Sequence, residues 1–238
     1  MSKDIEILQK LIDESDNIVF FGGAGVSTES GIKDFRGKNG LYTDSKEDTP
    51  EYMLSSRCLY RDTEKFFEYY RNNMNSLDKE PNITHKYLKE LEDKGKLKVI
   101  ITQNIDGLHQ KAGSLNVLEI HGSILNNYCD KCGKKYDSNY IFEREGIPRC
   151  TCKGLVRPDV VLYGEMLPEC FSLARNYIYK ADLLIVAGTS LTVEPASSLI
   201  KLFNGKDLVI INNTKTVYDD DASLVINEPL GKVFSKLR

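Results

Sequence analysis

The chain alternates between short apolar runs and segments whose apolar residues recur at helical spacing. The apolar runs predict buried strands over residues 17–21, 97–102, 117–120, 183–187, 208–211 and 224–226. Helical spacing predicts helices over residues 3–15, 83–94, 166–180 and 195–203. Alternation of this kind is typical of an α/β fold, in which helices cover both faces of a parallel sheet.

Two stretches interrupt this alternation. Residues 34–80 are rich in aromatic and charged residues and indicate a helical excursion from the sheet. Residues 124–157 are polar and contain four cysteines together with several glycines and prolines, which indicates a small inserted module. The length of 238 residues fits one large domain with a small insertion. We therefore expect a large domain formed by residues 1–123 and 158–238, with the module between its two parts.

The balance of charge argues against a nucleic-acid partner. Lys and Arg number 32 and Asp and Glu 35, which gives a formal net charge of −3, whereas a surface that binds phosphates broadly needs a basic excess. No run approaches the ~20 apolar residues of a membrane helix. Five acidic residues within the first twenty do not fit a secretory signal. We expect a soluble, cytoplasmic protein with no nucleic-acid or membrane partner.

Four cysteines in two close pairs predict a metal site within the small module. Two residues separate Cys129 from Cys132, and one separates Cys150 from Cys152, where two is the common zinc spacing. Zn²⁺ takes four thiolates in a tetrahedral arrangement that leaves no position for water, so we expect one structural zinc. Two disulfides are the alternative, but they are rare in a reducing cytosol. A module of this size would depend on its metal for stability.

A glycine-rich loop follows the first predicted strand. Gly22, Gly23 and Gly25 lie shortly before Thr28, and we expect a helix after them. Glycines let the backbone approach a pyrophosphate, and a helix N-terminus would offer free N–H groups and a positive dipole. The dinucleotide fingerprint needs a third glycine where this chain has Thr28. A tight turn without a ligand therefore stays open as an alternative.

Several motifs in one order resemble the sirtuin family, in its bacterial type. They are GAGVSTESGIKDFRG at residues 23–37, GLY at 40–42, TQNIDGLH at 102–109, His121 with Gly122, GTS at 188–190 and Asn212. The resemblance covers nearly the whole chain. It implies a Rossmann-like NAD-binding domain over residues 1–123 and 158–238, with residues 124–157 as the zinc-binding module.

The resemblance implies an NAD-dependent protein-lysine deacetylase, which transfers the acetyl group of acetyl-lysine to ADP-ribose and releases nicotinamide. NAD is then a co-substrate and not a hydride carrier. The acyl carbonyl oxygen attacks C1′ of the nicotinamide ribose and gives an alkylimidate. A deprotonated ribose hydroxyl then attacks the alkylimidate, and water releases the lysine. The expected partners are proteins or peptides that carry acetyl-lysine.

His121 is the residue that we expect to act as general base. Its pKa lies near ~6.5 in the absence of perturbation, so that it can accept a proton at neutral pH. It follows the predicted strand 117–120, and ligands of open α/β sheets bind at strand ends. A lone histidine is more often structural, and the place of His121 before Gly122 in the order of the family's motifs is what implies the catalytic role. His85 is expected to cap a helix or to lie at its surface, and His109 to have a packing role.

The resemblance also assigns the other site residues. Asn104 would contact the ribose and a positioned water, Asp106 the nicotinamide amide and Arg36 a phosphate, while Phe35 would shield C1′. The full set expected at the cofactor is Gly23, Ala24, Gly25, Thr28, Phe35, Arg36, Gln103, Asn104, Ile105, Asp106, Gly188, Thr189, Ser190 and Asn212. Val161, in a segment that resembles the substrate-binding strand, would lie near the acyl-lysine. Lys33 replaces a proline that is common in the family.

Simpler interpretations stay open for some of these residues. Asp106 suits the N-cap of a helix, residues 34–36 suit an exposed loop, and residues 156–165 suit a linker.

The alternative functions are a hydride-transferring dehydrogenase, a protein ADP-ribosyltransferase and a non-enzymatic, zinc-stabilised binding module. In the family that this chain resembles, a preference for negatively charged acyl chains goes with a tyrosine followed three residues later by an arginine. Here Asn73 follows Tyr70 at that distance, and we expect acetyl-lysine to be preferred over succinyl-lysine.

Overall fold

Six parallel strands form the central sheet of the computed structural model, which describes residues 2–35, 40–44 and 49–238. Their order across the sheet is β3-β2-β1-β7-β8-β9. The bounds are β1 (Ile18–Gly22), β2 (Leu97–Thr102), β3 (Val117–Glu119), β7 (Leu183–Ala187), β8 (Asp207–Ile211) and β9 (Leu224–Ile226). The predicted α/β fold with a parallel sheet is confirmed. Because the chain winds outward from β1 on one side and from β7 on the other, the switch point of the sheet lies between these two strands.

Helices cover both faces of the sheet because its strands are apolar on both. Phe20 points into the cluster under α1 (Lys3–Glu14), α6 (Ile83–Asp93) and α10 (Leu230–Phe234), whereas Val19 and Phe21 point into the cluster under α9 (Cys170–Lys180) and the 3-10 helix η3 (Ala196–Leu202). The short elements α7 (Leu108–Lys111) and η4 (Asp219–Asp221) lie in connections. Within the described ranges, no helix is both long and apolar enough to cross a membrane.

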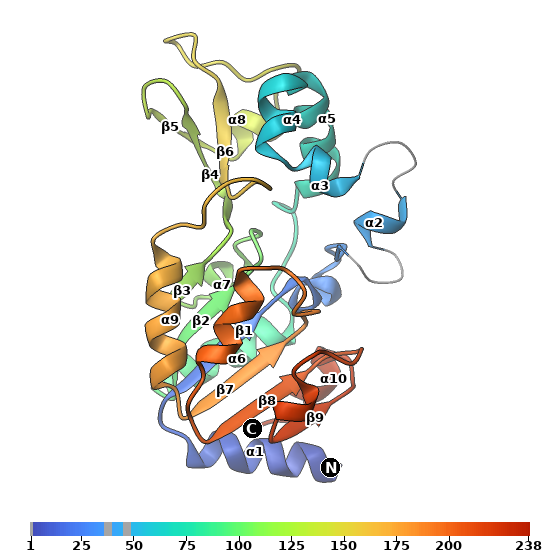
Figure 1. Cartoon of the computed structure of the whole chain (residues 1–238), viewed down its shortest axis with the longest axis vertical. Helices are drawn as coiled ribbons and strands as arrows, with labels where there is room; N and C mark the ends of the chain where they lie inside the picture. The colour runs from blue at the N-terminus through green and yellow to red at the C-terminus, as the bar shows by residue number, and fades with distance from the viewer. Residues whose placement is uncertain (1, 36–39, 45–48) are drawn as a thin grey trace.

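A second layer lies at the other end of the molecule (Figure 1). Its antiparallel sheet has the order β5-β4-β6. The elements of this layer are α2 (Leu41–Asp44), α3 (Pro50–Met53), α4 (Ser56–Arg61), α5 (Thr63–Met74), β4 (Gly122–Cys129), β5 (Lys135–Asp137), α8 (Asn139–Phe142) and β6 (Val156–Val160). Phe66 and Tyr70 of α5 share one hydrophobic cluster with Ile124, Ile141 and Leu155. The helical excursion therefore packs on the cysteine-containing segment.

The helix expected directly after the glycine loop is absent from the described chain, and that prediction is wrong. Two single 3-10 turns, η1 (Ala24–Val26) and η2 (Thr28–Ser30), replace it. Gly31 ends the second turn with a positive φ of 83°, in the left-handed region that glycine adopts without strain. The short polar side chains in the turns also compete with helical backbone bonding, as the Thr28 hydroxyl does by donating to Gly25 O.

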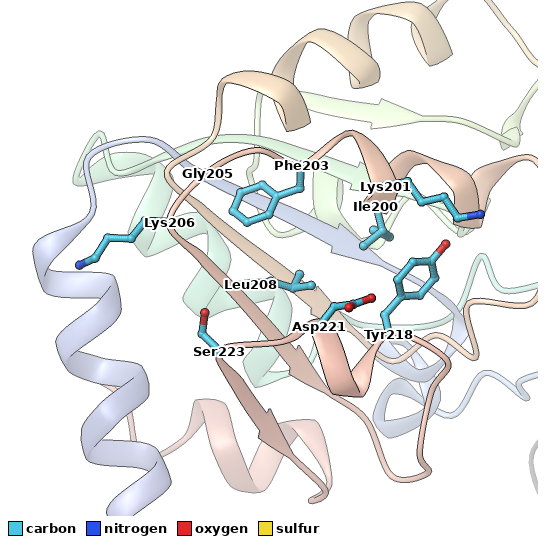
Figure 2. A pocket seen from close by; sticks show the side chains of 9 residues that line it. All are labelled: Ile200, Lys201, Phe203, Gly205, Lys206, Leu208, Tyr218, Asp221 and Ser223. Atoms are coloured by element: carbon cyan, nitrogen blue, oxygen red, sulfur yellow. The ribbon is translucent and has the colours of Figure 1, made fainter.

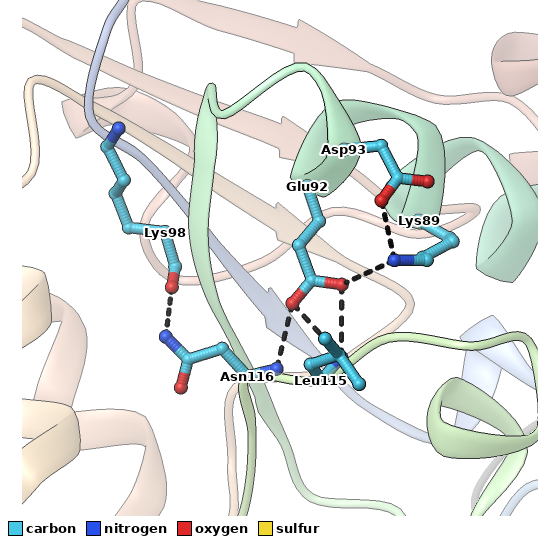
Figure 3. Close-up of polar contacts among 6 residues, drawn as sticks. All are labelled: Lys89, Glu92, Asp93, Lys98, Leu115 and Asn116. Carbon is cyan, nitrogen blue, oxygen red and sulfur yellow. Dashed lines mark hydrogen bonds and ion pairs between the residues drawn. The ribbon is translucent and has the colours of Figure 1, made fainter.

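Glu92 of α6 fixes the connection that leads into β3 (Figure 3). Its carboxylate accepts the backbone N–H groups of Leu115 at 3.0 Å and of Asn116 at 2.8 Å. Lys89 lies 3.6 Å from the same carboxylate and 2.7 Å from Asp93. Because β3 runs toward His121, this anchor at its start helps to set where the histidine lies.

Candidate active site

The sequence-predicted site and a separate hollow lie at opposite ends of the strands. The hollow, of about 440 Å³, is at the amino ends of β8 and β9, between Phe203, Leu208 and Tyr218 (Figure 2). None of the predicted site residues that the structure describes lines it. The predicted residues instead follow the carboxyl ends of β1, β2, β3, β7 and β8, where ligands of open parallel sheets bind.

The loops after β1 and β7 touch through their backbones. Gly25 N donates to Gly188 O at 2.8 Å, and Gly23 N donates to Ala187 O at 3.1 Å. A Cβ on Gly25 would lie 2.6 Å from Gly188 Cα. Gly188 itself has a φ of 61°. The glycines are therefore required for loop packing at the switch point, so the tight-turn interpretation holds whether or not a ligand also binds there.

Gln103 joins the loop after β2 to both of these loops. Its backbone N–H donates to Gly22 O at 3.0 Å, and its side chain donates to the Thr189 hydroxyl at 3.0 Å. Thr189 is buried and its hydroxyl also accepts from Leu191 N. Three strand ends thus share one hydrogen-bonded frame, in which the predicted residues Gln103 and Thr189 are internal ties.

Ser27 is a site residue to which sequence reasoning assigned no role. Its buried hydroxyl donates to Asp106 Oδ2 at 2.7 Å and accepts from Asn104 Nδ2 at 3.0 Å. The structure thereby brings Asn104 and Asp106 together on one serine. The signal in the sequence was a short polar residue inside the first motif, but its partners lie 77 and 79 residues away.

Asp106 lies in a mostly buried position. Burial raises the pKa of its carboxyl group, while the Leu108 N–H and the Ser27 hydroxyl act in the opposite direction. The N-cap of α7 is Gly107, not Asp106, so the capping interpretation is wrong in detail. The carboxylate forms an Asx turn instead, by accepting Leu108 N at 2.9 Å.

His121 is held by the backbone on both sides. Its Nδ1 lies 3.0 Å from Gln103 O, so Nδ1 carries the proton and Nε2 is left as the basic nitrogen. Burial lowers the pKa of the imidazole, and the bond to the carbonyl partly offsets this. The ring is therefore neutral at pH 7. The carbonyl oxygen of His121 accepts Val161 N at 2.9 Å.

The apolar residues predicted at the cofactor lie between the two layers. Phe35 and Ile105 are partly buried against the hydrophobic cluster of the second layer. The Phe35 ring meets Tyr42 edge-on at 6.4 Å, and the Tyr42 hydroxyl lies 3.2 Å from that of Tyr163. Arg36 lies outside the described residues. Phe35 is thus placed beside a segment that leads toward Val161.

An ion pair shapes the segment around Val161. Arg157 is buried, and its guanidinium contacts both carboxylate oxygens of Glu165 at 2.5 and 2.9 Å. Glu165 also accepts Leu162 N at 3.0 Å. Bidentate pairing of this kind fixes geometry as well as charge. The segment is therefore more than a linker, because its turn is closed by a specific pair.

The remaining predicted residues have short polar side chains engaged locally at strand ends. The Ser190 hydroxyl lies 2.8 Å from that of Thr192, and Asn212 Nδ2 donates to Thr214 O at 2.9 Å. Ala24 begins the first 3-10 turn and Thr28 begins the second. Their positions follow β1, β7 and β8, so all of them face the same edge of the sheet.

The two other histidines lie behind this edge. His85 is fully buried, so the expectation that it lies at the surface is wrong, while the capping expectation is met because its ring accepts Asn82 N at 3.3 Å. His109 is buried beside it, with ring centroids 4.7 Å apart, and has the expected packing position. Burial lowers the pKa of both, to about 4 for His85.

The four predicted cysteines converge at the far end of the second layer. Their Sγ atoms all lie within 4.8 Å of one another. The pairs Cys129–Cys152 and Cys132–Cys150 are 3.4 and 3.6 Å apart, and all four thiols are free. Zn–S bonds of ~2.3 Å in a tetrahedron need sulfurs about 3.8 Å apart. The cluster therefore fits one zinc ion and not two disulfides.

Glycine-rich loops at the switch point of an open parallel sheet are typical of α/β proteins that bind nucleotides. The chain belongs to the Sir2 family, whose profile matches residues 23–195.

Similar proteins agree with this. NAD-dependent protein deacetylases of Clostridium acetobutylicum (52% identity over 236 residues, 96% of each chain) and Clostridium perfringens (51% over 242 residues, 100% of this chain and 99% of that protein) are related to it. A solved structure of Sir2 bound to an acetylated peptide has a TM-score of 0.88 at 35% identity and covers 99% of this chain and 97% of that chain.

Proposed function

We propose that the protein is an NAD-dependent protein-lysine deacetylase, which moves the acetyl group of acetyl-lysine to ADP-ribose with release of nicotinamide. Two relatives that are 52% and 51% identical, and that the chain covers over 96% and 99% of their length, are named NAD-dependent protein deacetylases. The observation that carries the proposal is His121, held neutral with Nδ1 bonded to Gln103 O and with its own carbonyl bonded to Val161 N.

His121 Nε2 accepts the proton of a ribose hydroxyl in this proposal. The bond at Nδ1 fixes the tautomer, and the lowered pKa keeps the ring unprotonated at pH 7. NAD, when bound, supplies the electrophilic ribose carbon to which the acyl oxygen is transferred. Phe35 and Ile105 exclude water from that carbon, since both project apolar surface between the layers. Asn104 and Asp106, joined by Ser27, orient the nicotinamide end.

The glycine loops hold the phosphates and riboses. Gly23, Ala24, Gly25 and Thr28 offer backbone and hydroxyl groups on one side, and Gly188, Thr189, Ser190 and Asn212 on the other. Gln103 braces the two sides. The position of these loops at the carboxyl ends of β1 and β7 supports this, because ligands of open parallel sheets bind at the switch point. Arg36 is proposed as a phosphate contact on the family motif alone.

The acetylated peptide adds beside Val161 as a short strand. The segment after β6 already bonds to another part of the chain, with Tyr163 N donating to Leu54 O at 3.0 Å and Ser56 N to Tyr163 O at 3.1 Å. Backbone pairing of this kind gives affinity for many sequences. Substrates are therefore proteins or peptides selected mainly by their acetyl-lysine.

We infer two domains, a NAD-binding domain over residues 1–123 and 158–238 and a zinc-binding module over 124–157. The cluster that joins Phe66 and Tyr70 to Ile124 and Ile141 is where the helical excursion of the NAD-binding domain packs on the module. We also infer a cytoplasmic protein with neither nucleic acid nor membrane as partner. Its net charge of −3 and its free thiols support this.

One experiment separates this function from its rivals. An acetyl-lysine peptide is incubated with the protein, with and without NAD, and analysed by mass spectrometry alongside the His121→Ala variant. Conversion of acetyl-lysine to lysine is expected only when both NAD and wild-type protein are present, because the variant lacks the proposed general base. NAD-derived label retained on protein would indicate ADP-ribosyl transfer instead, and a change in absorbance of the nicotinamide ring would indicate hydride transfer.

A further inference from the structure

Asn82 connects a helix terminus to the glycine loop through one side chain. It is the N-cap of α6, and its Oδ1 accepts Thr84 N at 3.0 Å. Its Nδ2 donates in the opposite direction, to Val26 O at 2.8 Å and to the Ser30 hydroxyl at 3.0 Å. The amide thus serves as acceptor for the helix and as donor for a loop more than fifty residues earlier in the chain.

The two acceptors of this amide enclose Ser27. Val26 ends the first 3-10 turn and Ser30 ends the second, so that both residues flank the serine that joins Asn104 and Asp106. The backbone bonds of these turns end on the carbonyl groups of residues 23, 24, 27 and 28. The Val26 carbonyl is held by the Asn82 amide instead. Single 3-10 turns have weak bonding of their own, and an outside anchor fixes where they lie.

The anchor itself is rigid. The backbone N–H of Asn82 donates to Nδ1 of His85, which completes a capping box. His85 is fully buried and packs on the buried ring of His109. Asn82 is therefore fixed at its main chain by a buried ring and at its side chain by the first turn of α6, which leaves the Nδ2 group little freedom other than to hold the loop.

We propose that Asn82 is a positioning residue for NAD, acting through Ser27 on Asn104 and Asp106. This rests on the proposed function, because it assumes that those residues meet the nicotinamide end. Without the amide donor, the turn that carries Ser27 loses its anchor and the groups that it orients lose their alignment. The expected consequence is a loss of NAD affinity, because the hydrogen bonds of the Asn82 side chain go to the glycine loop and to α6 and not to the peptide segment around Val161.

Asn82→Asp tests the proposal without removing the helix cap. An aspartate retains the acceptor for Thr84 N, since Asp and Asn are equally good N-caps, but it cannot donate to Val26 O and brings a negative charge to that carbonyl. The matched control is Asn75→Asp. Asn75 Oδ1 accepts Leu77 N two residues on, as Asn82 Oδ1 accepts Thr84 N, but it lies outside the glycine loop and the site.

The readouts are the thermal midpoint, the KM values for NAD and peptide, and the calorimetric Kd for NAD. Asn82→Asp is expected to fold and to raise KM and Kd for NAD by about tenfold or more, the loss of ~1.4 kcal/mol, with the KM for peptide unchanged. Asn75→Asp is expected to match wild type. An unchanged Kd for NAD in folded Asn82→Asp, or equal losses of NAD and peptide affinity, would overturn the proposal.

Two further measurements keep the outcome clear. Combined with Ser27→Ala, Asn82→Asp is expected to add little to the loss of NAD affinity, because both act on one chain of contacts; additive losses would contradict action through Ser27. If Asn82→Asp does not fold, Ser30→Ala, which removes one acceptor of the amide, must weaken NAD binding in the same direction, or the proposal fails. Wild-type protein that binds NAD but does not deacetylate would overturn the proposed function while leaving this test intact.

Discussion

The backbone N–H of Val161 donates to the carbonyl oxygen of His121 at 2.9 Å. The proposed base and the proposed substrate strand are therefore one hydrogen-bonded unit. Gly122 follows the histidine with a φ of 76°, and a Cβ there would overlap the carbonyl oxygen of Asp159. The chain leaves the large sheet for the second layer at His121 and Gly122, and contacts with Val161 and Asp159 fix its path there.

Replacement of His121 by alanine should cut deacetylation by ~10²–10⁴, the range for a lost general base. Affinity for NAD should change little, because the ring is bonded to Gln103 O and not to the glycine loops. The wild-type rate should fall in acid, as pH drops through a pKa that burial holds below its usual value. Turnover near wild type in folded His121→Ala would remove the residue from the mechanism.

Loss of the metal should act on the reaction from a distance. β4 begins one residue after His121 and ends at Cys129, so unfolding of the cysteine cluster frees the strand that follows the base. Chelation or Cys132→Ser should release one zinc per chain and lower activity. Cys170→Ser, which lies outside the cluster, should retain the zinc and the activity. Elemental analysis checks the stoichiometry, and zinc-free protein with full activity would contradict the expectation.

Acetyl-lysine should be strongly preferred over succinyl-lysine. Arg71, the cation next to Tyr70 on α5, already donates to Ile141 O at 2.7 Å and to Gly146 O at 2.6 Å. Asn73 donates to Tyr69 O, and Tyr70 is fully buried among apolar residues. A carboxylate without a charged partner is costly to bury, by several kcal/mol. Values of kcat/KM on one peptide with either acyl group decide the matter, and a succinyl preference would refute it.

Stability should fall in acid because of the buried histidines. Burial lowers the pKa of His85 to about 4 and that of His109 well below its usual value. An unfolded histidine takes up a proton near pH ~6.5, so the unfolded state binds more protons between these values. The free energy of unfolding should therefore decrease from pH 6.5 toward 4, by up to about 3 kcal/mol for His85.

Urea unfolding over a pH series checks this. His85→Gln keeps an acceptor that can receive Asn82 N but does not titrate, so it is expected to flatten the curve between pH 6.5 and 4 relative to wild type. The carboxyl groups that titrate in the same range are common to both proteins. Their effect cancels when the free energy of unfolding of one protein is subtracted from that of the other at each pH. Parallel curves for the two proteins would show that His85 does not contribute.

The sheet was predictable because its strands are buried on both faces. Residues such as Phe20 and Phe21 make runs that are apolar without alternation, which distinguishes them from surface strands. The glycine loop was harder to predict. Two 3-10 turns replace the expected helix. Asn82 and Gly188 contact these turns, and because both lie far away in sequence, the local pattern does not reveal them.

The site was predictable as a set of motifs and not as a network. The four cysteines could be predicted from their spacing, and they do converge, whereas the role expected for His121 depends on the order of the family's motifs as well as on its position after a strand. Ser27 could not be given a role, because what makes it matter is a carboxylate 79 residues away. His85 was expected to cap a helix or to lie at its surface, and it does cap α6, but its ring is fully buried.

The contact between Gly25 and Gly188 means that these two glycines are required for folding as well as for the proposed binding of NAD. A side chain at either would wedge apart the loops of neighbouring strands before any nucleotide arrived. In a survey of single substitutions scored by the amount of folded protein in cells, both positions would rank with core residues such as Phe20. The glycines proposed to bind NAD are here the same residues that the packing of the loops requires, so substitutions at this edge of the sheet would lower the amount of folded protein and the turnover together.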